Sequence, residues 1–347
     1  MIRFECDYAE GAHPQILERL IETNFVQTAG YSRDEYCKKA AEHIKKLCKS
    51  DNCDVHFFVG GTQTNLTVIA SMLKPYEGVM SADTGHINVH ETGAIEACGH
   101  KVLTLPSPDG KITAEQVRAM YLEHVENPEP EHIVFPGMAY ISHPTENGTI
   151  YSKQELTELH KVCRECDIPL FMDGARLGYA LAAPGNDLEI HDIAALCDAF
   201  YIGGTKIGAL FGEALVITND KYKKNFRYHI KQRGALLAKG RLLGIQFETL
   251  FEDGLYMEIA KNAIDCAMII KKACESAGFE FLYDSPTNQQ FPILTNEQAA
   301  TLAKKYAFHE WARVDEGRVA VRFCTSWATK TQNAEELAED IARLGNA

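Results

Sequence analysis

The sequence predicts an α/β protein, with a large domain built on a mostly parallel sheet covered by helices and a smaller α+β domain at the C-terminal end. Between residues 55 and 218, apolar runs of strand length alternate with helix patterns, as expected for parallel strands joined by crossover helices. The chain has 347 residues, which exceeds the usual size of one domain. After about residue 279, short strand and helix patterns follow one another closely, which is typical of a compact end domain.

We divide the chain into three parts on this basis. Residues 1–50 form an N-terminal segment, with helix patterns at 15–24 and 34–50, that packs on the small domain and the active site. Residues 51–240 form the large α/β domain. Residues 241–347 form the small α+β domain, which a predicted helical stretch from Lys221 to Ser276 joins to the large one.

The elements of the large domain follow from the hydrophobic pattern. Helix patterns lie at 62–74, 113–126 and 152–166, and a short helix is expected at 192–198. Strands are predicted between and beside them, at 55–61, 78–83, 101–106, 132–142, 168–174, 198–206 and 214–218. In the small domain we expect strands at 279–283, 289–294, 308–314 and 318–326 and helices at 296–306 and 333–344.

The charge balance and the cysteines limit the class of partner. With 35 basic and 48 acidic residues the formal net charge is −13, which argues against non-specific binding to nucleic acid or an anionic membrane. The first residues contain no apolar run typical of a signal peptide, and no segment is as apolar and as long as a membrane span. Eleven cysteines without a secretion signal indicate reduced thiols, so we expect a cytoplasmic location.

An aspartate and a lysine follow neighbouring strands of the predicted sheet. Asp173 ends the run IPLFMDG, and Lys206 follows the run DAFYIGGT. Ligands of open α/β sheets bind at the carboxyl ends of the strands, so the two side chains are expected in one pocket. A lysine there is suited to a Schiff base with pyridoxal phosphate, and an aspartate to the pyridinium nitrogen. The alternative is that Asp173 caps a turn and Lys206 is a solvated surface charge.

A glycine turn after the first strand suggests an anion site. Gly60, Gly61 and Thr62 connect the predicted strand 55–61 to a helix, so free backbone N–H groups and the positive helix end face one point. A tight turn with a threonine cap gives the same pattern, and the motif alone does not separate the two.

Several other polar residues occupy positions of interest. His86 and His90 lie four residues apart and could share a helix face as a metal pair, but no acidic base stands between them, and we predict no metal. His143 lies at the carboxyl end of a predicted strand. Arg322 stands among apolar strand residues, so a substrate carboxylate or an internal acidic residue must pair with it. The basic run 227–241 is either a solvated face or a source of phosphate-binding cations.

Together these features resemble the fold-type I pyridoxal-phosphate enzymes, and most closely the low-specificity threonine aldolase and β-eliminating lyase family. The resemblance extends from about Cys6 to the last helix, and its most specific part is DGARL at 173–177. It implies that Asp173 binds the pyridine nitrogen and that Arg176 reaches the phenolate side of the cofactor and the substrate carboxylate. Lys206 would carry the aldimine, with Thr205 as a phosphate donor.

The same resemblance implies roles for residues elsewhere in the chain. His86 would stack on the cofactor ring, His143 would manage the β-hydroxyl proton, and Arg322 would clamp the substrate carboxylate. Gly60, Gly61 and Thr62 would bind the cofactor phosphate. Arg233 and Lys239 would reach the neighbouring subunit's phosphate, and the substrate side would include Cys6, Asp7 and Tyr31.

The resemblance implies a homodimer or homotetramer that cleaves small β-hydroxy-α-amino acids, L-threonine or L-allo-threonine, to glycine and an aldehyde. The sequence departs from the family around the substrate, with GTKIGAL at 204–210, Pro144 after His143, and Cys6 in place of serine. β-Elimination to ammonia and a 2-oxo acid, and amino transfer, therefore stay open as alternative reactions. A cofactor-free α/β scaffold that binds anions or proteins is the alternative without catalysis.

Overall fold

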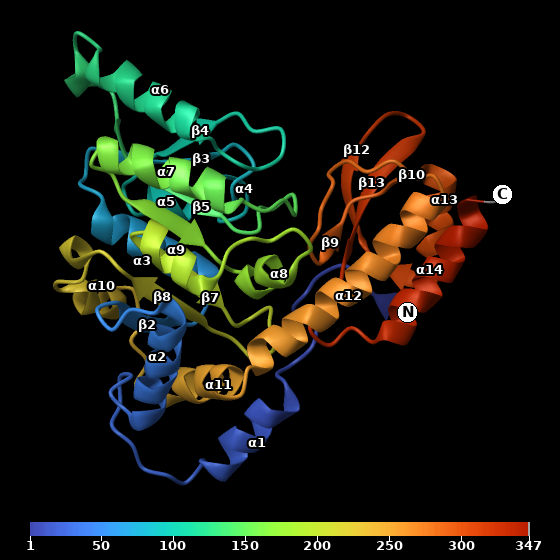
Figure 1. Ribbon diagram of the computed structural model, residues 1–347, viewed down its shortest axis with the longest axis horizontal. Coiled ribbons are helices and arrows are strands. Elements are labelled where there is room, and N and C mark those ends of the chain that lie inside the picture. Colours follow the sequence, from blue (N-terminus) through green and yellow to red (C-terminus); the bar gives the residue numbers. More distant parts are fainter. Residues whose placement is uncertain (346–347) are drawn as a thin grey trace.

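A seven-stranded sheet forms the centre of the larger lobe in the computed structural model, which describes residues 1–345 (Figure 1). Its strands are β2 (Asp54–Phe58), β3 (Glu77–Ala82), β4 (Val102–Leu105), β5 (Phe135–Ser142), β6 (Leu170–Asp173), β7 (Ala199–Gly203) and β8 (Glu213–Ile217). Their order across the sheet is β2-β8-β7-β6-β5-β3-β4. β8 pairs antiparallel with both neighbours and every other pair is parallel, which confirms the predicted mostly parallel sheet.

Alternate strand residues face opposite sides of this sheet, as the two-residue period of a strand requires. Ala139, Met172 and Phe200 belong to one buried cluster, whereas Tyr140 and Phe171 belong to another. Helices that pack in the first cluster are α2 (Glu35–Cys48), α6 (Ala114–Val125), α7 (Lys153–Glu165), α8 (Leu177–Ala182), α9 (Ile190–Leu196) and α11 (Arg241–Glu252). Those in the second are α3 (Gly61–Met72), α4 (His86–Val89), α5 (Ala94–Ala97) and α10 (Phe226–Gln232). The sheet is therefore covered on both faces.

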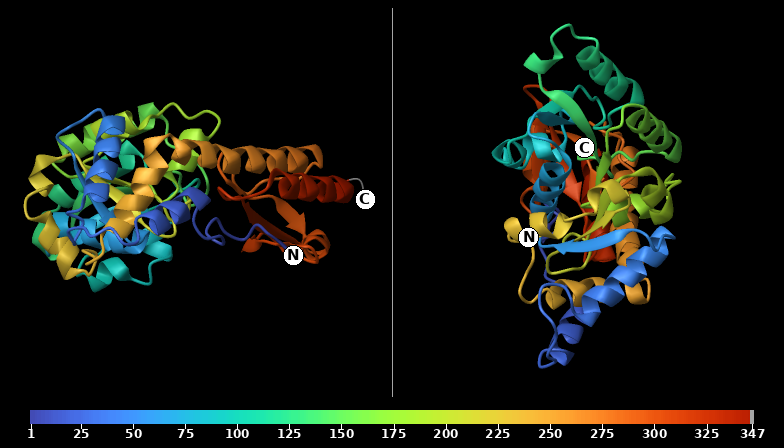
Figure 2. Two further views of the ribbon diagram at one scale, coloured as in Figure 1. Left: turned by 90° about the horizontal axis from the view of Figure 1, so that it is seen from below. Right: turned by 90° about the vertical axis from the view of Figure 1, so that its left-hand side faces the viewer.

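The smaller lobe extends away from the large sheet along the molecule's longest axis (Figure 2). Its strands are β9 (Gln289–Gln290), β10 (Ile293–Thr295), β12 (His309–Arg313) and β13 (Arg318–Cys324), all paired antiparallel through β13. Its helices are α12 (Leu255–Ser276), α13 (Asn296–Leu302) and α14 (Thr331–Gly345). A separate apolar cluster joins these elements, which agrees with an α+β end domain.

The N-terminal segment reaches both lobes. β1 (Ile2–Arg3) pairs parallel with β11 (Tyr306–Ala307), and Phe4 is buried in the cluster of the smaller lobe. The helix α1 (Pro14–Glu22) then lies beside α11, and α11 packs closely on α2 at the larger lobe. The boundaries at residues 50/51 and 240/241 stay predictions, and residues 346–347 of the last part lie outside the described residues.

Some predicted elements differ from the structure. The strand predicted at 279–283 is absent apart from a single bridge between Phe281 and Pro292. The strand predicted at 289–294 is divided into β9 and β10, because Pro292 has no N–H for a ladder. The helical stretch 221–276 contains a short 3-10 turn, α10, α11 and α12. Within residues 1–345 none of the helices combines the length and the apolar character that a bilayer crossing requires.

Candidate active site

A cavity of about 280 Å³ opens at the carboxyl ends of β5, β6 and β7. Ser142 ends β5 and Asp173 ends β6, and the two residues are direct neighbours in the ladder. Lys206 comes from the loop after β7. The predicted residues Gly60, Gly61, Thr62, His86, Asp173, Arg176, Thr205 and Lys206 all line this cavity. The parallel topology thus brings together side chains that lie far apart in the sequence.

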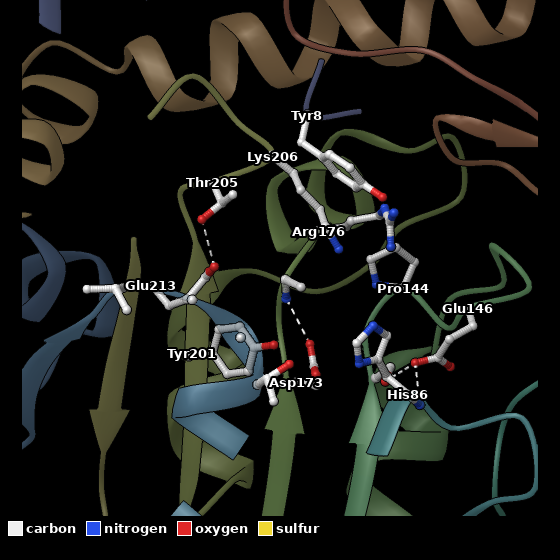
Figure 3. Close-up of a pocket in the computed structure, with 16 residues that line it drawn as sticks. Tyr8, His86, Pro144, Glu146, Asp173, Arg176, Tyr201, Thr205, Lys206 and Glu213 are labelled. Atoms are coloured by element: carbon white, nitrogen blue, oxygen red, sulfur yellow. Dashed lines mark hydrogen bonds between the residues drawn. The ribbon is translucent and has the colours of Figure 1, made fainter. Parts of the chain in front are cut away.

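Lys206 and Asp173 face the same cavity from opposite sides (Figure 3). The lysine side chain extends into the cavity from the loop, and the carboxylate rises from the strand end below it. Burial, with the nearby charge of Arg176, lowers the pKa of Lys206. A lowered pKa increases the fraction of neutral amine, which is the nucleophilic form of a Schiff-base lysine.

Hydrogen bonds hold the Asp173 carboxylate in place. Tyr140 donates its hydroxyl to Oδ2 at 2.6 Å, Asn65 donates Nδ2 to the same oxygen at 3.0 Å, and the Ala175 N–H donates to Oδ1 at 3.0 Å. Burial acts to raise the pKa of Asp173, but the charge of His86 and the bond from Tyr140 outweigh it and lower the pKa. Asp173 is therefore an anion at the floor of the cavity.

His86 is fixed by a buried carboxylate. Its Nδ1 lies 2.8 Å from Oε1 of Glu91, which also accepts a hydrogen bond of 2.7 Å from Asn65. Burial acts to lower the pKa of His86, but the bond to Glu91 and the charge of Asp173 raise it above its usual value. Asn65 connects Glu91 with Asp173, so the histidine and the aspartate belong to one hydrogen-bonded network.

The other end of the cavity is suited to an anion. Gly60 is the N-cap of the twelve-residue helix α3 and offers no side chain to the first N–H groups of the helix. A Cβ on Gly61 would lie 3.0 Å from the Tyr201 hydroxyl, so a larger residue would narrow this end. Glu213 also lines the cavity and accepts a bond of 2.9 Å from Thr205. Burial raises the pKa of Glu213, which favours its neutral form and reduces its repulsion of a phosphate. These residues fit the phosphate end of pyridoxal phosphate.

A second cavity of about 520 Å³ adjoins the first, between the two lobes. Five side chains line both cavities, namely Tyr8, His86, Glu146, Arg176 and Lys206. Arg322 lies in the second cavity, where it donates to the Glu5 carbonyl and the Gln289 side chain and lies over the Trp311 ring. Its Nε is buried without a partner in the described residues, and Nη1 and Nη2 each keep a second N–H, so the guanidinium retains donors for an incoming carboxylate.

Arg176 forms a bidentate pair with Asp7. The Nε and Nη2 atoms of the arginine lie 2.6 and 3.0 Å from the two carboxylate oxygens. Asn288 donates a third bond, of 2.9 Å, to Asp7. Burial acts to raise the pKa of Asp7, but Arg176 and then Lys206 lower it to about 2. Asp7 therefore serves first as the partner of Arg176 and joins the N-terminal segment to the site.

We expect Asp7→Asn to destabilise the protein by about 3–5 kcal/mol, the usual cost of leaving one charge of a buried pair alone. Because the folded pKa of Asp7 is below its unfolded value, its contribution is present above about pH 4 and is lost as the pH falls toward 2. Urea unfolding at neutral pH and at about pH 3 measures both effects.

The control for this prediction is Asp265→Asn, which removes an exposed partner of Lys261 and should cost less than about 1 kcal/mol. An equal loss in the two variants would contradict the structural role of the Asp7–Arg176 pair.

The structure does not bring every predicted residue to the cavities. His143 has no exposed surface, lines neither cavity, and receives the Tyr151 N–H on Nδ1 at 3.3 Å. Burial lowers its pKa to about 4. This position does not match a direct contact between His143 and a substrate, because Pro144 and not His143 faces the cavity.

Three further predicted residues lie apart from these cavities, although Cys6 lines the second. Tyr31 is exposed, with Lys231 over its ring at 4.6 Å. Arg233 is the C-cap of α10, and Lys239 lies in the loop after that helix. The predicted role of Arg233 and Lys239 toward a neighbouring subunit's phosphate stays a prediction, as does the role of Tyr31 on the substrate side.

Several polar residues at the site were not predicted from the sequence. Glu146 accepts bonds from the Ser142 hydroxyl, at 2.7 Å, and from the His86 N–H, at 3.0 Å. The others are Asn65, Glu91, Tyr140, Tyr201, Glu213 and Trp311. Glu91 and Glu146 each follow a predicted site histidine by a few residues, and this proximity was the only signal available.

The fold and the lysine–aspartate cavity define a class, the fold-type I pyridoxal-phosphate enzymes. Residues 7–346 match the model of the Beta-eliminating lyase family, and the chain belongs to this family. It is 30% identical to a low specificity L-threonine aldolase of a Pseudomonas species, over 99% of this chain and 98% of that one. A low specificity L-threonine aldolase of Escherichia coli K12 is 29% identical over 72% of each chain.

Solved structures agree with this assignment. A threonine aldolase of Leishmania major has a TM-score of 0.96 and 46% identity, covering 99% of this chain and 100% of that chain. An aspartate aminotransferase of Thermus thermophilus has a TM-score of 0.72 at 15% identity, covering 99% and 91%, and so shares the fold. The predicted fold class and family are confirmed.

Proposed function

We propose that this protein is a pyridoxal-phosphate-dependent carbon–carbon lyase that cleaves β-hydroxy-α-amino acids, L-threonine or L-allo-threonine, into glycine and an aldehyde. The observation that carries the proposal is the pair of adjoining cavities with Lys206 at their boundary. One cavity has the aspartate and the anion end that the cofactor needs, and the other has the arginine that an amino-acid carboxylate needs. The relatives named above as threonine aldolases favour this reaction over amino transfer.

Bound pyridoxal phosphate supplies an electron-poor ring that stabilises negative charge on the substrate Cα. Asp173 would keep a proton on the ring nitrogen, because His86 and the bond from Tyr140 hold its buried carboxylate in the ionised form. The N–H groups at the start of α3 would hold the phosphate, and Thr205 lines the same cavity with its hydroxyl donated to Glu213. His86 would pack on the ring, and Lys206 would provide the amine that anchors the cofactor.

The substrate carboxylate binds Arg322, whose guanidinium is oriented by the Glu5 carbonyl and by Gln289. Arg176 contributes its charge nearby, although Asp7 already occupies two of its donors. Fixing the carboxylate sets the orientation of the bonds at Cα, and the bond to Cβ is the one that breaks.

We also propose a cytoplasmic location and a homodimer or homotetramer whose sites are shared between subunits. All eleven cysteines lie in the described part of the chain and carry free thiols, as expected in a reducing compartment. The positions of Tyr31, Arg233 and Lys239, away from the cavities of their own chain, leave them available to a neighbour's site.

Product analysis of the cofactor-loaded protein with L-threonine and L-allo-threonine tests the function. Glycine with acetaldehyde would support it, and the ratio of the two rates would give the preference at Cβ. A 2-oxo acid with ammonia would overturn carbon–carbon cleavage in favour of β-elimination. A colourless protein that does not respond to added cofactor would overturn the enzyme assignment.

We expect His143→Ala to keep threonine cleavage within about a few fold of the unsubstituted protein, because its ring does not line either cavity. Removing a buried side chain should lower stability by about 1–3 kcal/mol instead. Steady-state kinetics and thermal unfolding separate the two effects. A loss of activity of about 10²-fold or more in folded protein would return His143 to the proton transfer.

A further inference from the structure

We infer that Glu146 is the base that removes the proton from the β-hydroxyl of the substrate, an inference that rests on the proposed function. Carbon–carbon cleavage needs a proton acceptor close to the β-oxygen, at the point where the cofactor and substrate cavities meet. Five side chains line both cavities, and Glu146 is the only carboxylate among them within residues 1–345. The reacting bonds must lie at this boundary.

The carboxylate is held by one oxygen and left free at the other. Oε1 accepts two hydrogen bonds, one of 2.7 Å from the Ser142 hydroxyl and one of 3.0 Å from the backbone N–H of His86. Oε2 is buried and has no hydrogen-bond partner in the described residues. A buried carboxylate oxygen without a donor is costly, so the position is explained if a substrate hydroxyl supplies that donor.

The other four side chains at the boundary are less suited to this step. Arg176 does not lose its proton in proteins, and Lys206 is already assigned as the amine that anchors the cofactor. His86 gives its Nδ1 to Glu91, and its raised pKa favours the protonated form. The phenol of Tyr8 is more than half exposed to water. Glu146 alone combines a free acceptor, burial and a fixed position.

Burial raises the pKa of Glu146. The hydrogen bond from Ser142 opposes this rise, whereas the negative charge of Asp173 increases the pKa further. The charge of His86 acts in the opposite direction, and Lys206 and Arg176 are the other charged groups at the boundary. A carboxylate with a raised pKa is a stronger base than an exposed one, which suits it to a hydroxyl proton.

The step balances without a further reactant. Glu146 Oε2 takes the hydroxyl proton, the O–H electron pair forms the carbonyl of the aldehyde, and the Cα–Cβ bond breaks. The electron pair of that bond stays on Cα, which a proton then converts to glycine. Glu146 then releases its proton to water, Cα gains one proton by a route that does not use Glu146, and nothing is oxidised or reduced.

The test compares Glu146→Gln with Glu158→Gln, an exposed glutamate on α7. In Glu146→Gln we expect kcat for threonine to fall by roughly 10²–10⁴-fold, because the amide keeps the shape but cannot accept a proton. Exchange of the glycine α-proton with deuterated water needs no β-hydroxyl base. The exchange rate of Glu146→Gln should therefore stay within about 3-fold of the rate of Glu158→Gln. The Glu158→Gln variant should keep both reactions.

A pH profile and infrared spectroscopy provide readouts that do not depend on the size of kcat. The rise of kcat/KM with pH should be lost in Glu146→Gln, and should move to higher pH in Ser142→Ala, since the Ser142 bond lowers the pKa of Glu146. In the infrared difference between the unsubstituted protein and Glu146→Gln, one titrating buried-carboxyl band should be lost, while the band of buried Glu213 should stay in both.

Three results would overturn the inference. Unchanged cleavage in Glu146→Gln would exclude the base role, and equal loss of cleavage and of glycine exchange would indicate that Glu146 only supports His86. If the unsubstituted protein exchanges the glycine proton but cleaves no β-hydroxy amino acid, the proposed function fails, and the role of Glu146 fails with it.

Discussion

Lys206→Ala should abolish the covalent cofactor attachment that borohydride reduction makes permanent. It should also reduce threonine cleavage by roughly 10³-fold or more, in the range seen when a covalent nucleophile is removed. The lysine is placed at the boundary of the two cavities, and burial with Arg176 lowers its pKa, so its neutral amine is available for the Schiff base. Borohydride reduction followed by peptide mass analysis measures the attachment directly. In the unsubstituted protein the modified peptide should contain residue 206.

Lys161→Ala is the control, because this exposed lysine on α7 has no contact with either cavity. This variant should retain the cofactor colour, the covalent attachment at residue 206 and the rate of threonine cleavage. The alanine variant at position 206 should still bind cofactor without the covalent bond, because the anion end at α3 and Asp173 are unchanged. A reducible adduct at another lysine would contradict the assignment of Lys206.

The parts of the site that the sequence predicted well are those tied to the strand ends. Asp173 and Lys206 follow apolar runs directly, and a parallel sheet gathers such ends at one edge, so their meeting follows from the order of elements. The turn at Gly60 and Gly61 was identified for the same reason, since it lies between a strand and a helix. The family resemblance then gave the roles.

The residues that were missed depend on side-chain direction. His143 follows its strand as closely as Asp173 does, yet its ring is buried away from the cavity and the next residues, Pro144 and Glu146, face it. In an extended chain, consecutive side chains face opposite sides, so a shift of one residue reverses the direction. The pattern of residue types does not determine which of them faces the cavity. Local hydrophobicity alone could not select Glu146 over His143.

The missed polar groups also form one connected unit. His86 meets Glu91, Asn65 links Glu91 to Asp173, and Tyr140 donates to the same aspartate. Three of these lie on α3, on β5 and in the segment between α4 and α5, which are far apart in sequence. Such a network is defined only in three dimensions, because each member has an ordinary helix or strand position when it is considered alone.

Asp173→Asn should reduce the rate by roughly 10²–10³-fold or more, since it removes the charge that keeps a proton on the ring nitrogen. The substitution replaces one carboxylate oxygen, a hydrogen-bond acceptor, with an NH₂ group, which is a donor. Both carboxylate oxygens accept from donors, namely Tyr140, Asn65 and the Ala175 N–H, so an amide NH₂ would face a donor in either orientation. We therefore also expect a stability loss of about 1–3 kcal/mol from the unpaired group.

A cofactor analogue methylated on the ring nitrogen distinguishes the chemical effect from the structural one. Its permanent positive charge needs no aspartate, so it should restore a large part of the rate in Asp173→Asn but should not restore the lost stability. Tyr140→Phe is the matched comparison, because it removes one hydrogen bond and keeps the carboxylate. Its rate should fall by about 10-fold or less. Equal losses in the two variants, with no response to the analogue, would show that Asp173 contributes through packing and not through its charge.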